Sequence, residues 1–232
     1  MRVLLCAVAV AFIAQRGGEN PDEVYRHRED LSMAAHAADL WAARAAADFE
    51  SAWKLARACY WLGRHLPQSG RRAALERGIS AGETAIRLNP QRPEGHYWLA
   101  ADMGRLAETE GMWQGIKYRG RIRSELERVV AIDPAWSGGA GDEALGEWYA
   151  TVPRLFGGSD ADAEAHLRRA LDSDGHNLSA LVFLGEFLLD RHRATEADGL
   201  LRRALSADSD PEWQLEDREL RAKAQRLLDH IY

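Results

Sequence analysis

The side chains in this chain that most readily do chemistry are its eight histidines and two cysteines, and their spacing argues against a metal site. A zinc site needs several Cys, His or carboxylate ligands at characteristic separations, often paired on one helix face. No HExxH or HxxxH pair occurs, and neither Cys6 nor Cys59 has a metal-type partner in the sequence. We therefore expect no metal and no other cofactor.

The usual catalytic motifs are also missing from the sequence. Glu164 and His166 lie two positions apart, which on a helix points them in different directions, so they do not form a dyad. No Gly-x-Ser-x-Gly sequence or Walker loop occurs. Glycine clusters at 138–141 and 157–159 precede predicted helices, where backbone amides can hold an anion, but no predicted strand precedes either one. We interpret both as interhelical turns and expect no enzymatic activity.

The apolar pattern predicts helices that occur in pairs. The clearest pair lies near the C-terminus, at Leu184, Gly185 and Leu188 followed by Ala197, Leu201 and Ala204. This spacing is typical of a tetratricopeptide repeat, a unit of about 34 residues with small residues where its two helices touch. Earlier copies begin at Trp53, Tyr97 and Leu145, with nine, nine and five extra residues between their halves.

Helix-ending signals agree with these pairs, and together they predict the fold class. Pro or Gly follows each apolar run, at Asn89-Pro90, Asp133-Pro134, Asp174-Gly175 and Asp210-Pro211. No run alternates with period two, so we expect no sheet. One amphipathic hairpin cannot bury its apolar face alone, and stacked neighbours share a continuous core. We predict an all-α, tetratricopeptide-like right-handed superhelix of stacked hairpins.

The predicted domain boundaries follow from the same helix-ending signals. Residues 1–14 resemble a signal peptide, and 15–232 form one solenoid domain. Within it we expect an N-terminal helix at 21–47, four hairpins over about 48–209, and a polar-backed capping helix at 211–231. The inserted residues of the first two hairpins, near 66–74 and within 109–120, are expected to be loops.

Composition and the N-terminus limit the partners and the location. The net charge is -6, and the basic runs are interleaved with acids, so we expect no nucleic acid. The apolar run at 3–14 has the length of a signal h-region and is shorter than the roughly 20 residues that span a bilayer, so we expect no stable membrane insertion. We predict an exported, periplasmic protein. The alternative is an unprocessed N-terminal helix on a cytoplasmic protein.

Several segments of the chain resemble two related families. They are Pro93 to Ala100, Gly115-Ile116-Lys117 with Ile122, Leu145 to Tyr149, and Phe156 to Ser159. They are similar to the tetratricopeptide T-component of bacterial TRAP transporters and to the animal regulator of microtubule dynamics proteins, over roughly residues 50 to 230. The bacterial resemblance implies a periplasmic accessory protein whose partner is often the transporter's solute-binding protein. Leu5 before Cys6 departs from the lipoprotein N-terminus usual in that branch.

In a stack of this kind the first helix of each hairpin lines the concave surface, and the repeat register gives the residues that face it. The predicted partner-binding groove consists of Lys54, Trp61, Trp98, Asp102, Arg105, Glu143, Glu147, Thr151, Val182, Glu186 and Asp190. The resemblance adds His96 at its lip. Five carboxylates against two bases predict an acidic groove, suited to an extended peptide or helix with basic and apolar side chains.

Simpler interpretations of these residues stay open. Trp61 and Trp98 adjoin core positions, the acids are compatible with a solvated face, and His96 is compatible with a bond to a neighbouring helix end. A secondary candidate surface, Trp113, Lys117 and Tyr118, lies in the second insertion. Its aromatic residues would equally serve to pin that insertion onto the solenoid.

The sequence therefore predicts a noncatalytic scaffold that binds a protein or peptide partner. The main alternative is a carrier of a small molecule or lipid, with an apolar pocket enclosed by the stack. A third hypothesis is a structural module that self-associates through its end helices. An open acidic groove would favour the scaffold, and an enclosed ring with a wide apolar channel would favour the carrier.

Overall fold

The computed structural model describes residues 19–231, except for the side chains of residues 112–114. This part of the chain contains eleven α-helices, two short 3-10 helices and no strand, which confirms the all-α prediction. The α-helices are α1 Pro21–Tyr25, α2 Leu31–Ala45, α3 Phe49–His65, α4 Gln68–Leu88, α5 Pro93–Glu110, α6 Met112–Ile132, α7 Ala140–Thr151, α8 Asp160–Ser173, α9 Leu178–Leu189, α10 Ala194–Ser206 and α11 Gln214–Asp229. The 3-10 helices are η1 Trp136–Gly138 and η2 Arg154–Phe156. The predicted signal peptide at 1–14 lies outside the described residues.

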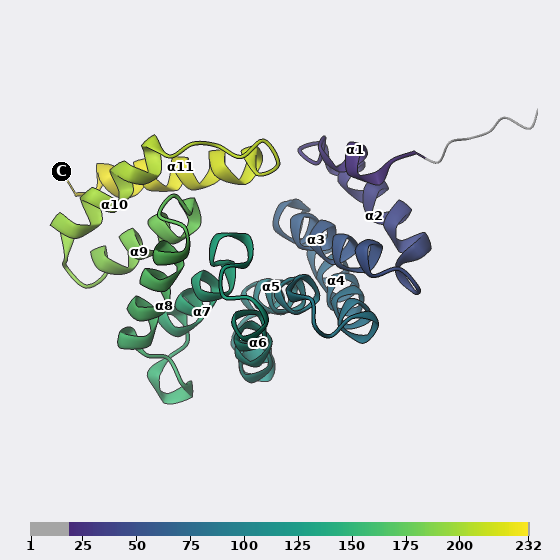
Figure 1. The fold of residues 1–232 in the computed structure, drawn as a ribbon, viewed down its shortest axis with the longest axis horizontal. Coiled ribbons are helices and arrows are strands. Elements are labelled where there is room, and N and C mark those ends of the chain that lie inside the picture. Colours follow the sequence, from purple (N-terminus) through teal and green to yellow (C-terminus); the bar gives the residue numbers. More distant parts are fainter. Residues whose placement is uncertain (1–18, 232) are drawn as a thin grey trace, which may run out of the picture.

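The helices are arranged as consecutive antiparallel hairpins that curve into an arch. The pairs α3–α4, α5–α6, α7–α8 and α9–α10 follow one another around it, and α11 lies across the open side of the arch toward α1 (Figure 1). Side chains shared between successive hairpins form the core, as expected for a repeat protein.

Small residues hold the helices of the stack close together. A Cβ added to Gly146 would lie 2.5 Å from Leu167 Cγ on the second helix of its hairpin, and one added to Gly185 would lie 2.8 Å from Leu201. Gly82 on α4 is equally close to the next hairpin, because its Cβ would lie 3.0 Å from the Cα of Leu99. These contacts explain the glycines of the repeat pattern.

The N-terminal helix predicted at 21–47 is in fact two helices, so that boundary is wrong. Residues 26–30 leave the helical path between α1 and α2. The Asp30 carboxylate accepts a hydrogen bond from the Ser32 backbone N–H at 2.8 Å and starts α2 as its N-cap. Asp is a strong N-cap residue and a weak one inside a helix, so the chain breaks at this point.

The two nine-residue insertions lengthen helices instead of forming loops, contrary to the prediction. In the second hairpin α5 continues to Glu110 and α6 begins at Met112, so only Gly111 separates them. Gly111 has φ of 84°, a left-handed value that glycine adopts readily. The shorter insertion in the third hairpin does form a connection, which contains η2.

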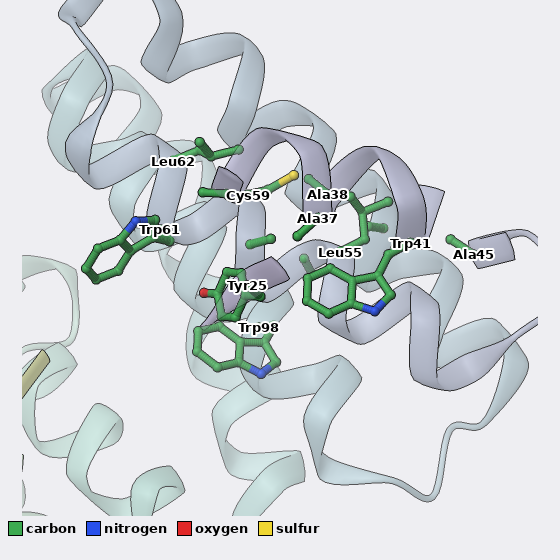
Figure 2. Packing of buried hydrophobic residues seen from close by; sticks show 14 of the residues in the cluster. Tyr25, Ala37, Ala38, Trp41, Ala45, Leu55, Cys59, Trp61, Leu62 and Trp98 are labelled. Atoms are coloured by element: carbon green, nitrogen blue, oxygen red, sulfur yellow. The ribbon is translucent and has the colours of Figure 1, made fainter. Parts of the chain in front are cut away.

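The N-terminal hairpins enclose the largest apolar cluster. Tyr25 of α1 packs edge-on against Trp41 of α2 with ring centroids 5.4 Å apart, and Cys59 of α3 is fully buried beside them (Figure 2). Trp98 of α5 joins the same cluster and links it to the second hairpin. Cys59 is therefore a buried packing residue.

Candidate functional site

The arch encloses a central cavity of about 1140 Å³. Side chains from the first helix of each hairpin, α3, α5, α7 and α9, line it, which confirms the prediction about these helices. The remaining wall comes from α6, from Val152, Pro153 and Phe156, and from α11. The sequence had indicated α11 only as a cap for the end of the solenoid. The concave side is therefore a cavity closed on one side by the last helix, and not an open groove.

Ion pairs join α11 to the first helices of the chain. Arg28 Nε donates a hydrogen bond to Glu216 Oε1 at 3.1 Å, and its Nη2 donates to the Glu212 carbonyl oxygen at 2.8 Å. Arg57 Nη1 contacts the Glu212 carboxylate at 2.5 Å. We call this contact between α11 with its preceding turn and α1–α3 the seam.

The seam continues along α3. The Glu219 carboxylate accepts hydrogen bonds from the Arg64 guanidinium and from His65 Nε2, the latter at 2.8 Å. Both partners lie about two helical turns beyond Arg57 on the same helix. Bases on α3 thus face Glu219 of α11 and Glu212 of the turn before it.

Aromatic rings also bridge the seam. Trp213, just before α11, stacks on Trp98 of α5 with ring centroids 6.4 Å apart and an interplanar angle of 18°. The Arg57 guanidinium lies over the Trp213 ring at 5.9 Å and over the Tyr25 ring at 4.8 Å. Since Trp213 packs against the N-terminal cluster, α11 is more than the polar-backed cap that the sequence predicted: it connects both ends of the arch.

Two carboxyl groups in the cavity wall are held near neutrality. Burial, and then the nearby Glu108 carboxylate, raise the pKa of Glu147 to about 7, against the opposing effect of Lys223 and Arg105. Burial and the neighbouring Glu147 raise the pKa of Glu143 well above its ordinary value. Desolvation disfavours the ionised carboxylate in both cases. The cavity wall therefore carries less negative charge than its residue types suggest.

The predicted acidic character of the concave surface is wrong. The acids that line the cavity are Glu108, Glu143, Glu147, Glu216 and Glu219, and the bases are Arg57, Arg64, Arg105, Arg119, Lys223 and Arg226. The bases are at least as numerous as the acids, because α6 and α11 contribute charges that a register on the first helices alone does not include, and α3 contributes Arg57 and Arg64.

Six of the predicted groove residues do line the cavity: Trp61, Trp98, Arg105, Glu143, Glu147 and Thr151. Trp61 and Trp98 are almost fully buried, so their rings are part of the core as well as the wall. The Trp61 indole N–H donates to the Arg28 carbonyl oxygen at 2.7 Å and so supports the seam. Arg105 contacts Glu108 at 2.6 Å on the same helix.

Three predicted groove residues, His96, Asp102 and Val182, are buried away from the cavity, so their predicted position is wrong. His96 contacts Glu125 of α6 at 2.6 Å and the Pro90 carbonyl oxygen at 3.1 Å, which matches the simpler interpretation of a bond to a neighbouring helix. Val182 is covered in a cluster that includes Ala224 and Leu228 of α11.

Asp102 is a fully buried carboxyl group whose two oxygens have no hydrogen-bond partner in the described part of the chain. It packs against α4 at Gly78, where an added Cβ would lie 2.3 Å from its Oδ2 atom. Burial raises its pKa well above the ordinary value, so the neutral acid is the favoured form in the fold.

Asp102 and Val182 share one cause, a register error of one position on α5 and on α9. On α5 the cavity stripe runs through Tyr97, Ala101, Gly104 and Glu108, and on α9 it runs through Ser179 and Phe183. One residue corresponds to about 100° around a helix, which turns Asp102 and Val182 out of the cavity.

The other predicted groove residues lie at the edges of this site. Lys54 contacts Asp22 of α1 at 2.8 Å in a second hollow, outside the cavity, between α1, α3 and residues 209–218. Glu186 contacts the cavity-lining Lys223 at 2.5 Å. Asp190 is exposed at the C-terminal end of α9. In the secondary surface, Lys117 is exposed and lies over the Tyr118 ring at 4.7 Å, while the Trp113 side chain is outside the described part.

Sequence reasoning missed the residues of the seam, Arg28, Arg57, Arg64, Trp213, Glu212, Glu216 and Glu219. A signal for them was present. Arg57 and Arg64 are seven apart, and Glu212, Glu216 and Glu219 are spaced by four and three, so each set lies on one helix face. Complementary charge stripes on helices far apart in the sequence are consistent with contact between those helices.

The described residues can also be searched for a metal site and for a membrane-spanning helix. Among residues 19–231 no three His, Cys, Asp or Glu side chains are grouped as metal ligands would be. Within that part of the chain, no helix is both long and apolar enough to cross a membrane.

Comparison with known proteins now gives the family. A family model described as the TRAP transporter T-component matches residues 83–232, which is more than half of the chain. The chain belongs to the TRAP transporter T-component family. No curated protein matches this T-component in sequence. The matched part runs from within α4 to the end of α11, so it includes the acidic side of the seam and not the bases on α1 to α3.

A solved structure confirms the repeat fold of this T-component. This chain is similar to the crystal structure of a thermophilic TPR protein of Thermus thermophilus, with a TM-score of 0.68 and 22% sequence identity. The match covers 90% of this chain and 97% of that one. At this identity the likeness shows the tetratricopeptide-like fold and nothing about partners.

Proposed function

We propose that this T-component is a noncatalytic accessory protein of a TRAP transporter, exported to the periplasm, where it binds a protein partner. The family match carries the proposal, because it is the observation that links the chain to a transporter. The fold supports it, since tetratricopeptide-like stacks present extended concave surfaces to other proteins. The solute-binding protein of the transporter is the partner we propose.

The partner site we propose is the mouth of the central cavity. The predicted residues Arg105, Glu147 and Thr151 line it together with Glu108 and Lys223. The mixture of both charge signs with aromatic rings is suited to steering and anchoring a polar surface of the partner. The predicted preference for basic peptides is not part of this proposal, because the wall is not acidic.

A charge reversal at the mouth tests this site. Glu108 is exposed and is paired with Arg105 on the same helix, and Glu76 on α4 is paired with Arg72 in the same way, outside the cavity. Affinity for the purified solute-binding protein is measured by calorimetry. We expect Glu108→Lys to weaken binding roughly tenfold and Glu76→Lys to leave it unchanged. Equal affinities for both variants and the parent would exclude the cavity mouth as the site.

A second candidate function, a carrier of an apolar small molecule or lipid, is supported by the size of the cavity. A volume of about 1140 Å³ is enough for a large ligand. Trp98, Phe183, Trp213 and Leu220 give its wall apolar surface. The charged residues in the same wall weigh against a purely apolar occupant.

Mass spectrometry of molecules retained by the purified protein separates these two functions. A ligand released on denaturation, and lost in Phe183→Asp, would favour the carrier. Recovery of the solute-binding protein with no retained small molecule would favour the accessory role.

A further inference from the structure

Two carboxyl groups in the cavity wall have no basic partner. Three of the five acids in the wall are ion-paired, namely Glu108, Glu216 and Glu219. In the described part of the chain, no base and no hydrogen-bond donor contacts the carboxylate of Glu143 or Glu147. These two acids are therefore the ones in the wall whose hydrogen-bonding capacity is unused.

Glu143 gives the stronger indication of a ligand, because it is buried. It is 6% exposed, lies in the first turn of α7 and lines the cavity. Buried polar side chains almost always have hydrogen-bond partners, because an unpaired one costs free energy. A buried carboxyl that borders a cavity without a partner is complementary to a ligand group that carries N–H donors.

The bases nearest to Glu147 are already paired with other acids. Lys223 and Arg105 are the two bases that act on its ionisation. Lys223 contacts Glu186 at 2.5 Å, and Arg105 contacts Glu108 at 2.6 Å. Each of these pairs is neutral overall, so neither base compensates an ionised Glu147.

The remaining bases of the wall lie on helices other than α7. Arg57 and Arg64 are paired with acids across the seam. The Arg119 guanidinium lies over the Phe156 ring at 5.1 Å, and Arg226 is exposed in the last turn of α11. The charge of the wall is thus mixed as a whole, while its two unpaired acids lie together on one helix.

Aromatic rings lie beside these acids. Burial first, and then the nearby Glu143 carboxylate, raise the pKa of the Tyr97 phenol well above its usual value, so this phenol and this carboxylate are neighbours. The Tyr97 ring packs edge-on against Trp98 with centroids 5.1 Å apart, and the Tyr60 ring lies 5.7 Å from Trp98. All three rings line the cavity. We call Glu143, Glu147, Tyr60, Tyr97 and Trp98 the acidic aromatic corner.

We propose that the acidic aromatic corner binds the ammonium group of a small organic cation. Glu143 and Glu147 are four residues apart on α7, so their side chains are neighbours and one ammonium, with three N–H donors, reaches both. Tyrosine and tryptophan rings attract the same positive charge through their faces. Contact with an ammonium favours the ionised carboxylates, which offsets the effect of their burial.

This ligand site goes beyond the proposed accessory role, because it concerns a small molecule inside the arch. It shares Glu147 with the proposed partner site at the cavity mouth, whereas Glu143 is not part of that site. For the carrier candidate it specifies a ligand with a charged end instead of a purely apolar one. The test below contains no solute-binding protein, so either proposal can fail without the other.

The test is a calorimetric titration of the full chain with three matched probes at pH 8. The probes are 2-phenylethylamine, which is positively charged, 2-phenylethanol, which is neutral, and 3-phenylpropanoate, which is negatively charged. Each is titrated to roughly 10 mM, since ligands of this size reach about millimolar affinity. At this pH the Glu147 carboxyl, whose pKa is about 7, is mostly ionised.

Two substitutions that preserve side-chain size locate the site. Glu143→Gln removes one carboxylate from the corner. Asp102→Asn is the matched control, because Asp102 is also a buried carboxyl without a partner in the described part of the chain, but it packs against α4 away from the cavity. Circular dichroism verifies that each variant is folded, and the three probes test the parent chain whether or not Glu143→Gln folds.

We expect the amine to bind roughly 30-fold more tightly than the alcohol, from the usual contribution of hydrogen bonds to charged groups. The negatively charged probe should show no binding. Glu143→Gln should weaken amine binding roughly tenfold and leave alcohol binding unchanged. Asp102→Asn should change neither.

Four outcomes would overturn the proposal. No heat of binding with the amine excludes the site. Equal affinities for amine and alcohol would show an apolar pocket that does not recognise charge. Tighter binding of 3-phenylpropanoate would mean that the bases of the wall select the ligand. Equal losses of amine binding in Glu143→Gln and Asp102→Asn would indicate a general change in the fold instead of a lost contact.

Discussion

Neighbouring hairpins of the arch and the two ends of the arch are joined by different physical contacts. Between α4 and α5 the backbone of Leu99 approaches Gly82 so closely that no Cβ fits, and the contact is apolar. Between α3 and α11 with its preceding turn the partners are charged, with Arg57 and Arg64 facing Glu212 and Glu219. Apolar packing depends on shape and is weakened when even one carbon is added or removed. Ion pairs tolerate small displacements and respond to salt.

This difference suggests separate roles for the two regions. The hairpin contacts determine the curvature of the arch, because each repeat fixes the orientation of the next. The seam determines whether the cavity has a closed side, since α11 provides that wall. Variants in the stack should therefore change global stability, and variants in the seam should change mainly the closure of the cavity.

The largest expected effect is in the stack. Leu99 is fully buried, and Leu99→Ala should lower the free energy of unfolding by about 3 kcal/mol, because it loses apolar burial and leaves a cavity. Leu155→Ala is the matched control, since Leu155 is 87% exposed, and should change it by less than about 0.5 kcal/mol. Urea unfolding followed by circular dichroism measures both. Similar losses in the two variants would contradict the assignment of the core.

A pH effect of similar size is expected in the cavity wall. The pKa of Glu147 is raised from 4.5 to about 7 in the folded protein. Between these values the folded state binds more protons than the unfolded state, so the stability contributed by this group is highest below pH 4.5 and falls as the pH rises through 7. Glu147→Gln should reduce this loss in the free energy of unfolding between low and high pH by up to about 3 kcal/mol.

Urea unfolding at pH 5 and pH 8 measures the Glu147 effect. Asp102→Asn should reduce the same pH dependence from a second position, because the Asp102 carboxyl is also buried in its neutral form. An unchanged difference between the two pH values in both variants would show that these carboxyls are not desolvated.

A smaller effect separates two glycines that lie in similar helices. Gly82→Ala should destabilise the protein by about 2 kcal/mol, since the new methyl group would overlap Leu99. Gly104→Ala meets no atom within 4 Å and should stabilise α5 by about 0.5–1 kcal/mol. The two substitutions should therefore shift the midpoint temperature of unfolding, measured by differential scanning calorimetry, in opposite directions. A shift in the same direction would show that the hairpin contact relaxes around the added carbon.

The smallest effect concerns the ion pairs of the seam. Arg28 and Glu216 have side chains only 5% and 18% exposed, and Arg218 and Glu29 are both 67% exposed in the same region. Double-mutant cycles should give a coupling free energy of about 2 kcal/mol for the first pair and about 0.3 kcal/mol for the second. The coupling should fall at high salt for the exposed pair first. Equal couplings would mean that the seam is solvated throughout.

Sequence reasoning recovered the local parts of this molecule. The spacing of Leu184, Gly185 and Leu201 predicts a hairpin because its information lies within one repeat, and the structure confirms it. The structure of the inserted residues was harder to predict, since whether they lengthen a helix or form a loop depends on neighbours several residues away. Gly111 alone separates α5 from α6, which no pattern of apolar residues indicates.

The candidate site was predicted only in part, and the reason is again distance along the chain. Arg105, Glu143 and Glu147 line the cavity as predicted, because the first helices of the hairpins face inward. Asp102 was misplaced because an error of one residue turns a side chain by about 100°. The closing wall depends on pairs such as Arg28 with Glu216, which only the curvature of the complete arch brings together.

The seam also sets an order of events during synthesis. Arg28 and Glu216 are 188 residues apart, so this contact cannot form until almost the whole chain has left the ribosome. Each hairpin can fold as it emerges, because its contacts are local, whereas closure has the slow kinetics of long-range pairing. A nascent chain halted before residue 212 would therefore hold an arch with its interior still open, and the final residues close that side of the cavity.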